Sequence, residues 1–299
     1  MNIHIRSPVE FEKCLDHTFS KSIELTRTRM TIQQLLDSHE DEDFLIKSLE
    51  TYCAQYLKIL QSVTNTTTLL KQPLFSWSID GENIQTSCWL FEGIIPHIAL
   101  YNLYVKQATE KANADDFKSA NKLFQKAETK CIQSLNLAAR WKWKIPSMNH
   151  KIVMGRWHIA QKYMTQTYQH LCYIGVALEN DSNSKTLLTL SERAFKSASK
   201  AYVNWKENDS EHLIKIADGL RHLFNSHLNW ENNKYGASIY TLQTYFSEPM
   251  PNTFKRLNEE FEKIPFLLQE RISTNDGAYF DPIKPHQNES TTEEIINRV

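Results

Sequence analysis

Glycine and proline are scarce in this chain, with only 7 and 9 among its 299 residues. Sheet sandwiches and barrels depend on many tight turns, so this scarcity argues against both classes and favours long helices. So few glycines also leave little room for phosphate-cradling loops, and no GxGxxG, P-loop or GxSxG motif occurs. The sequence therefore predicts a mainly α protein and gives little support to an enzyme.

Cysteine is sparse as well, and its five positions stand roughly forty residues apart without a CxxC pair. An odd, dispersed set fits reduced thiols better than a disulfide framework. An HExxH motif is absent, and His222 and His227 are five residues apart, a poor spacing for two ligands on one helix. We expect no metal and no cofactor.

The chain lacks both a charge excess and a long apolar run. Its 34 basic and 35 acidic residues give a net charge of −1, which argues against general nucleic-acid binding. The most apolar stretch, around residues 88–105, is interrupted by Glu92, Pro96, His97 and Asn102, so we expect no transmembrane segment. The N-terminus has no signal-peptide run, and the final INRV contains no cysteine for prenylation. We expect a cytoplasmic protein with at most peripheral membrane association.

The strongest pattern lies in residues 74–110. Phe75 and Trp77 predict an extended segment, which runs into a polar turn at Asp80–Asn83. A helix is expected from about Thr86, because apolar residues then advance by three or four at Leu90, Ile94, Ile98, Tyr101, Val105 and Ala108. Its other faces are apolar too, which predicts a helix buried inside a larger helical body.

The same spacing predicts helices along most of the chain. We expect them at about residues 9–37, 39–63, 117–138, 149–179, 185–206, 210–230, 235–246 and 252–273. Residues 1–8 are expected to form a short strand or arm, and the tail from Asn275 to be extended and polar. No linker composition divides the body, so we predict one domain over residues 1–285 and a polar tail over 286–299.

Two local patterns have more than one reading. The pair of predicted helices around the Asn232–Lys234 turn resembles a tetratricopeptide unit, but no strict period repeats elsewhere, so any solenoid is irregular. The segment Arg140–Lys144 alternates basic residues with tryptophans. It fits a membrane or nucleic-acid contact, but we favour a helix end with packed tryptophans and solvated lysines.

Several stretches, taken in order, resemble the BRO-one domain family, the Alix-type module of the ESCRT pathway. They are SWSID with LFEGIIPHIALYNLYVKQA, the dipeptide Ala160–Gln161, LFNSHLNWENNKYGASIYTLQ, and NDGAYFDPIKP. The resemblance covers about residues 8–285 and is closest to the short Brox-like kind. The chain departs from the family in its shorter N-terminus, in Gly236–Ala237 where the family has Gly-Glu, and in the missing prenylation box.

The resemblance implies a fold and a function. The fold is a single curved (banana-shaped) helical domain with a tetratricopeptide-like irregular solenoid core and a few short N-terminal strands. The function is that of a non-catalytic adaptor in endosomal sorting, recruited to endosomal or nuclear membranes. Its concave face would bind the amphipathic C-terminal helix of an ESCRT-III charged multivesicular body protein, a helix-in-groove mode.

The family's contact positions fall on two predicted helices. Met164 matches the first apolar contact, and the second and third fall among Leu187, Leu188 and Leu190, with the register open by about a turn. Lys162 and Lys151 would meet acidic residues of the partner helix. Tyr279 matches the tyrosine of the family's tail segment.

Plainer readings stay open for these residues. A methionine at helical spacing is more often a core residue than a contact, and Tyr279 fits plain packing as well. The three leucines cannot all be buried on one helical stripe, so at least one is expected to be exposed. The alternative function is a helical-repeat interaction scaffold with a different, non-ESCRT ligand, and an enzyme is a weaker third.

Overall fold

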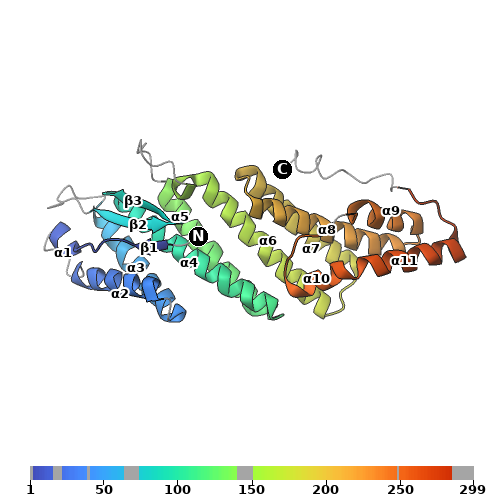
Figure 1. Cartoon of the computed structure of the whole chain (residues 1–299), viewed down its shortest axis with the longest axis horizontal. Coiled ribbons are helices and arrows are strands. Elements are labelled where there is room, and N and C mark those ends of the chain that lie inside the picture. The colour runs from blue at the N-terminus through green and yellow to red at the C-terminus, as the bar shows by residue number, and fades with distance from the viewer. Residues whose placement is uncertain are drawn as a thin grey trace. The chain divides into compact units, whose positions relative to one another are not determined.

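The structure is a computed structural model that describes residues 3–15, 22–38, 41–63, 74–139, 151–247 and 249–284. Helices dominate these residues, and the short strands form one three-stranded sheet (Figure 1). The prediction of a mainly α protein with a few short N-terminal strands is therefore confirmed. The chain divides into two compact units, Met1–Tyr104 with Thr129–His158 and Val105–Glu128 with Ile159–Val299. The prediction of one domain over residues 1–285 stays a prediction.

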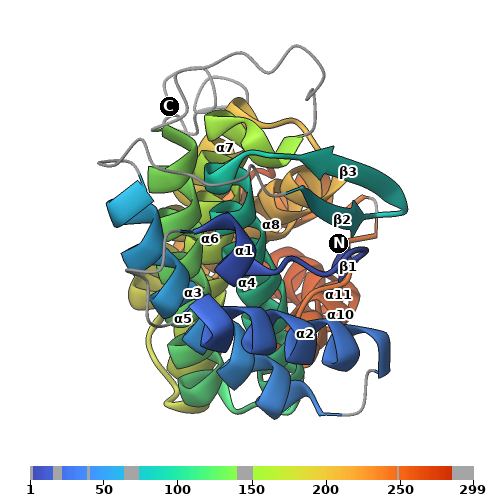
Figure 2. The same ribbon diagram turned by 90° about the vertical axis from the view of Figure 1, so that its left-hand side faces the viewer.

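The first unit begins with the sheet and three helices. Its elements are β1 (Ile3–Ile5), α1 (Phe11–Cys14), α2 (Ser22–Ser38), α3 (Glu42–Val63), β2 (Phe75–Ile79), β3 (Glu82–Thr86) and the first part of α4 (Trp89–Asn113). The strands pair antiparallel in the order β1-β2-β3, and α2 packs against β1 and α3 (Figure 2).

The turn between β2 and β3 corrects one prediction. The helix begins at Trp89 rather than near Thr86, because Glu82–Thr86 pairs with β2 as a strand. Asp80 and Gly81 both have positive φ, +50° and +88°, as a two-residue hairpin turn of the type I′ kind requires. The polar residues of β3 face outward on an edge strand, so the sequence shows no alternation that would reveal it.

The single helix predicted over residues 9–37 is also wrong. Helix α1 ends at Cys14, and Leu15 is extended with φ −107° and ψ 151°. The hydroxyl of Thr26 on α2 accepts a hydrogen bond from the backbone N–H of Phe11 at 2.9 Å and donates one to Glu12 at 2.6 Å. These bonds hold the short α1 against α2. In a single straight helix, Phe11 and Glu12 would lie too far from Thr26 to form them.

Helix α4 confirms the prediction of a buried helix. Every residue from Leu90 to Tyr101 is buried, including the polar Glu92 and His97. Gly93 lets the helix approach its neighbours closely, since a Cβ there would lie 3.3 Å from the side chains of both Tyr56 and Leu137. Other elements of the protein cover this part of α4 on all sides, which explains why its sequence is apolar on all faces.

The remaining helices follow in order along the chain. They are α5 (Phe117–Ala139), the short 3-10 turn η1 (Lys151–Val153), α6 (Gly155–Glu179), α7 (Ser184–Asn204), α8 (Asn208–Glu231), α9 (Tyr235–Tyr245), α10 (Lys255–Glu262) and α11 (Ile264–Thr274). The expected helix pair around Asn232–Lys234 is present as α8 and α9, which pack against each other. The segment Arg140–Lys144 lies outside the described residues.

Two predictions near the C-terminus need correction. The helix expected over 252–273 is split at Lys263 into α10 and α11, because Pro265 in the first turn of α11 has no N–H to continue the earlier helix. Residues Asn275–Tyr279 form a π-helical turn, η2, instead of an extended tail. The side chain of Asn275 stabilises the turn by bonding both the N–H and the C=O of Asp281.

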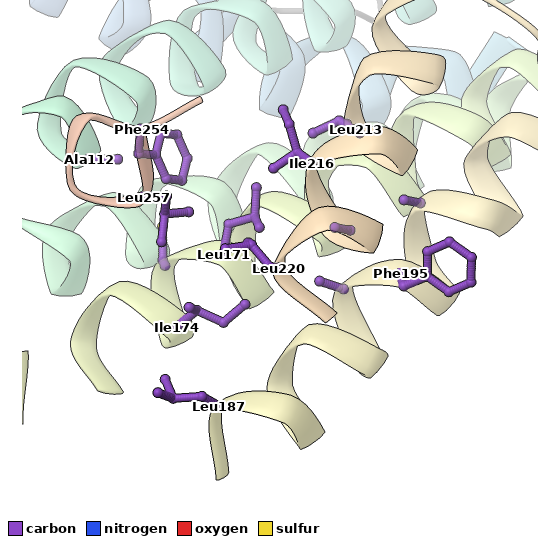
Figure 3. Close-up of a cluster of buried hydrophobic side chains, with 14 of the residues drawn as sticks. Ala112, Leu171, Ile174, Leu187, Phe195, Leu213, Ile216, Leu220, Phe254 and Leu257 are labelled. Carbon is purple, nitrogen blue, oxygen red and sulfur yellow. The ribbon is translucent and has the colours of Figure 1, made fainter. Parts of the chain in front are cut away.

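The second unit has its own apolar core. Figure 3 shows side chains that meet there from Ala112 of α4, Leu171 and Ile174 of α6, Leu187 and Phe195 of α7, Leu213, Ile216 and Leu220 of α8, and Phe254 and Leu257 near α10. Small residues on α7 let α8 approach closely, since Ala194, Ala198 and Ala201 are fully buried. This core positions the surface of α6 and α7.

Candidate partner-binding face

Helices α6 and α7 are joined by a short turn with defined chemistry. Asp181 adopts a left-handed φ of +49°, and the side chain of Asn183 caps α7 by accepting the N–H of Thr186 at 2.9 Å. The cap satisfies a backbone donor at the start of α7 and fixes where its buried stripe begins.

The structure buries two of the predicted contact residues. Met164 is 6% exposed and Leu187 is 7% exposed, and both belong to the core of the second unit. Leu188 and Leu190 are half-buried and pack against that core. At least one of the three leucines was expected to be exposed, but Leu188 and Leu190 are only half-buried because both pack against the core.

Tyr163, not Met164, reaches the surface of α6. Successive helical residues turn by about 100°, so neighbouring side chains point in different directions. Tyr163 is half-buried, and on the same side of α6 lie Gln166, His170 and Tyr173. The side chain of Tyr173 is 41% exposed, which makes this side both aromatic and accessible.

The outer side of α7 carries a basic stripe. Residues Lys185, Thr189, Arg193, Lys196, Lys200 and Val203 advance by four, four, three, four and three, so they share one face. All are exposed except Lys200, which is half-buried. The one acidic residue beside them is Glu192, so the stripe has a clear positive excess.

Tyr163 lies between two lysines and joins the two helices at the surface. The Nζ of Lys162 is 5.5 Å from the centre of the Tyr163 ring, and the Nζ of Lys200 is 5.4 Å from it. These are cation–π distances, so the ring supports both ammonium groups while leaving them their hydrogen-bond donors.

His170 marks a second junction between the helices. Its pKa is lowered first by burial and then by the nearby cation of Arg193 on α7. Gln166 and Gln169 of α6 each donate a hydrogen bond to a different carboxylate oxygen of Glu128 on α5, at 2.7 and 2.8 Å. These bonds fix α6 against α5.

We define the α6–α7 face as Lys162, Tyr163, His170 and Tyr173 of α6 with Lys185, Arg193, Lys196 and Lys200 of α7. Sequence reasoning identified Lys162 but missed the others. The spacing of the basic residues on α7 was visible in the sequence and is the signal that could have revealed them. Lys151 is half-buried in η1 and belongs to the other compact unit.

Tyr279 lies on a separate aromatic cluster. Its ring stacks on Tyr235 at 3.8 Å with an interplanar angle of 12°, and its edge faces Trp230. The carboxylate of Asp281 accepts the N–H of Gly236 at 2.8 Å, which ties this end of the chain to α9. Tyr279 is nevertheless 48% exposed.

Within the described ranges, no three side chains of His, Cys, Asp or Glu come together as a metal site would require. None of the described helices has the length and apolarity needed to cross a bilayer. All five cysteines are buried free thiols. Burial raises the pKa of Cys53, Cys88 and Cys172 to about 12, which keeps these thiols protonated and poorly nucleophilic.

Comparison with known proteins finds similarity in structure alone. No protein-family model and no curated protein matches the chain. A chain of the "ALIX BRO1 CHMP4C complex" superposes with a TM-score of 0.74 at 13% identity, covering 98% of this chain and 91% of that one. ALIX in complex with the SIVmac239 PYKEVTEDL late domain gives 0.71 at 13% identity, covering 97% and 46%.

A third solved structure, described as the "Structure basis for endosomal targeting by the Bro1 domain", gives a TM-score of 0.66 at 13% identity. It covers 98% of this chain and 88% of that chain. Nearly the whole chain is matched each time, so it has the fold of a BRO1 domain. This confirms the fold that the sequence resemblance implied.

Proposed function

We propose that this chain, which has the BRO1 domain fold, is a non-catalytic adaptor that binds the C-terminal amphipathic helix of an ESCRT-III subunit. The observation that carries the proposal is the α6–α7 face, an accessible aromatic and basic surface on a BRO1 fold. One structural neighbour is a BRO1 domain of ALIX in a complex with CHMP4C. Another bears on endosomal targeting by a Bro1 domain, so we propose recruitment to endosomes as the setting.

The face suits a partner helix with an apolar stripe flanked by acidic residues. Tyr163 offers an accessible ring, while Leu188 and Leu190 offer half-buried apolar surface on α7. A few such anchors supply most of the energy in helix-in-groove binding. Lys162, Lys196 and Lys200 would then meet the acidic residues and set the orientation of the helix.

The predicted contacts take different roles in this proposal. Leu188, Leu190 and Lys162 remain direct contacts. Met164 and Leu187 lie in the core, and we propose that they hold the α6 and α7 backbones in place beneath the partner helix. A methionine in such a position can also repack when a ligand arrives, because its side chain is unbranched and flexible.

A titration of the full chain with a C-terminal peptide of a charged multivesicular body protein tests the proposal. We expect saturable binding that Tyr163→Asp and Leu188→Asp each weaken by roughly tenfold or more, as for hot-spot residues. Lys255→Glu on the exposed surface of α10 is the matched control and should bind like the unaltered chain. Absence of binding, or equal binding by all variants, would reject the proposal.

One observation favours a second candidate function. With Met164 and Leu187 buried, the most apolar of the expected anchors are not on the surface. The same fold could therefore serve as an interaction scaffold for a ligand outside the ESCRT pathway. A screen of acidic amphipathic helices in which ESCRT-III peptides bind no better than unrelated ones would support this alternative.

The perturbed side chains support a non-catalytic role. The pKa values of His97, His158 and His227 are each lowered to about 4 by burial, above all other causes. They lie far apart in the sequence, and each is engaged by its own neighbours: Gly93, Ile152 and Arg271. Such isolated, structurally bonded groups differ from the convergent acids and bases of an active site.

A further inference from the structure

The second unit contains a cavity that the α6–α7 face does not use. Its volume is about 200 Å³, and it is bounded by the end of α4, the middle of α6, the start of α8 and the loop before α10. Since a water in the liquid occupies about 30 Å³, the cavity has room for several waters or one long side chain. The cavity is partly open to solvent, so a partner can reach it.

The floor of the cavity is apolar and largely buried. It consists of Leu213 and Ile216 from α8, Phe254 from the loop and the ring of Tyr168 from α6. Figure 3 shows Leu213, Ile216 and Phe254 among the side chains of the core. The Tyr168 ring stacks on Phe124 with centroids 5.2 Å apart and an interplanar angle of 7°, which fixes it in place.

The rim carries polar side chains that the rest of the structure does not engage. Asn113, Asp209, His212 and Asn252 line the cavity and are exposed, whereas Tyr168, which also lines it, is half-buried. Within the described residues, none of these five side chains makes a hydrogen bond or ion pair. Convergent polar groups above an apolar floor are the usual composition of a ligand site.

The charge of the rim is that of a cation site. Among the described residues that line the cavity, Asp209 is the one carboxylate, and none is a lysine or an arginine. The hydroxyl of Thr109 already donates to the Val105 carbonyl at 2.9 Å, so its oxygen is left to accept. Helix α4 ends at Asn113, and the negative end of a helix dipole favours a cation.

The positive end of α8 lies at the same place but is already compensated. The Glu207 side chain accepts an N–H of the first turn, and Ser210 bonds the N–H of Glu207 in return. This capping box satisfies two of the donors at the start of α8, and the carboxylate of Glu207 there disfavours an anion. The close carboxylate of Asp209 also helps to raise the pKa of Tyr168 to about 12, after burial, so its hydroxyl stays neutral.

We propose that this cavity receives a lysine or arginine side chain from a protein partner, as a second docking point separate from the α6–α7 face. The alkyl stem of the side chain lies along Leu213, Ile216 and Phe254. Its charged head meets the carboxylate of Asp209 and the oxygen of Tyr168. The apolar residues of the cavity thus match the stem of a long basic side chain, and its polar oxygens match the cationic tip.

Methyl NMR of the full chain, labelled at isoleucine, tests this proposal. The probe is a blocked pentapeptide with one lysine between glycine and serine residues, compared with the same peptide carrying norleucine. We expect the lysine peptide to shift the Ile216 methyl signal in a saturable way and to leave the core residue Ile174 unchanged. The norleucine peptide should cause no saturable shift.

Two matched variants make the test specific. Asp209→Asn should weaken binding of the lysine peptide at least fivefold. Asp181→Asn, an exposed residue in the turn before α7, should leave the binding unchanged. Equal binding of the norleucine peptide, no binding of the lysine peptide, or unaltered binding in Asp209→Asn would each overturn the proposal. Variants of Tyr163 leave this cavity intact, so failure of the ESCRT-III proposal would appear separately.

Discussion

The Nε of Arg29 donates a hydrogen bond to Oε1 of Glu92 at 2.8 Å, and the two side chains are 2% and 0% exposed. The pair joins α2 to α4 across 63 residues of sequence. The hydroxyl of Tyr52 also donates to Glu92, at 2.6 Å, and the indole N–H of Trp77 donates to its other oxygen at 2.5 Å. The single buried carboxylate of Glu92 on α4 thus binds side chains from helices α2 and α3 and from strand β2.

Replacing Glu92 by glutamine should destabilise the protein strongly. Burial is the largest single influence and lowers the pKa of Arg29, yet the pKa is raised because Glu92 and Tyr52 together outweigh burial. Without the carboxylate, the guanidinium is a buried charge with no counter-ion, which typically costs about 3–5 kcal/mol. Urea unfolding measures the loss. Arg27→Met, an exposed change on the same helix, should stay within about 0.5 kcal/mol, and a similar loss in both variants would contradict this account.

Stability should fall on acidification through His158. The ring is fully buried, its Nε2 faces the Ile152 carbonyl at 2.7 Å, and Ser134 lies 3.0 Å from Nδ1. Burial lowers the pKa of His158 to about 4, whereas an unfolded histidine titrates near about 6.5. The unfolded chain therefore binds the proton first, so the stabilisation is present above pH ~6.5 and is lost as the pH falls towards ~4.

The pH effect has a defined size and control. One such histidine contributes up to about 1.4 kcal/mol per pH unit to the slope of unfolding free energy, to a total of about 3 kcal/mol. His158→Gln should remove one histidine's share of that slope in unfolding measured between pH 6.5 and 4.5. His212→Gln, an exposed residue, should leave the slope unchanged. An unaltered slope in His158→Gln would show that this ring does not titrate as described.

Gly175 on α6 should not tolerate even a methyl group. A Cβ at this position would lie 2.6 Å from ring atoms of Phe117, a buried side chain on α5. Overpacking of this kind typically costs about 1–3 kcal/mol, which outweighs the gain in helix propensity. Gly175→Ala should therefore lower the free energy of unfolding. Gly277→Ala is the control, since nothing lies within 4 Å of its Cβ, and a stabilised Gly175→Ala would be inconsistent with the observed packing.

The long helices were predictable because their apolar residues recur every three or four positions over many turns. The breaks at Leu15 and Lys263 were not, since each depends on a contact or a proline position within an otherwise periodic stretch. Strand β3 was missed because its residues are polar and lie at a sheet edge. The spacing of residues within one segment does not reveal which distant segment of the same chain will pack or pair with it.

The candidate site shows the same limit at the level of one residue. Resemblance predicts a contact at Met164, which is 6% exposed, whereas the neighbouring Tyr163 is half-buried because a helix turns about 100° per residue. A shift of one position along the helix therefore exchanges a buried side chain for a half-buried one, and the contact role of Met164 stays a prediction. Only the three-dimensional neighbours, Lys162 and Lys200 around the Tyr163 ring, distinguish the two.

The most direct test of the central claim is a charge exchange on the α6–α7 face, read as the Kd of the ESCRT-III peptide. Lys196→Glu with Lys200→Glu should weaken binding at least tenfold at low salt, since like charges then face the acidic helix. A peptide whose acidic residues are replaced by lysine should recover most of that loss with the altered chain and bind the unaltered chain poorly. Equal affinities in all four combinations would contradict binding at this face.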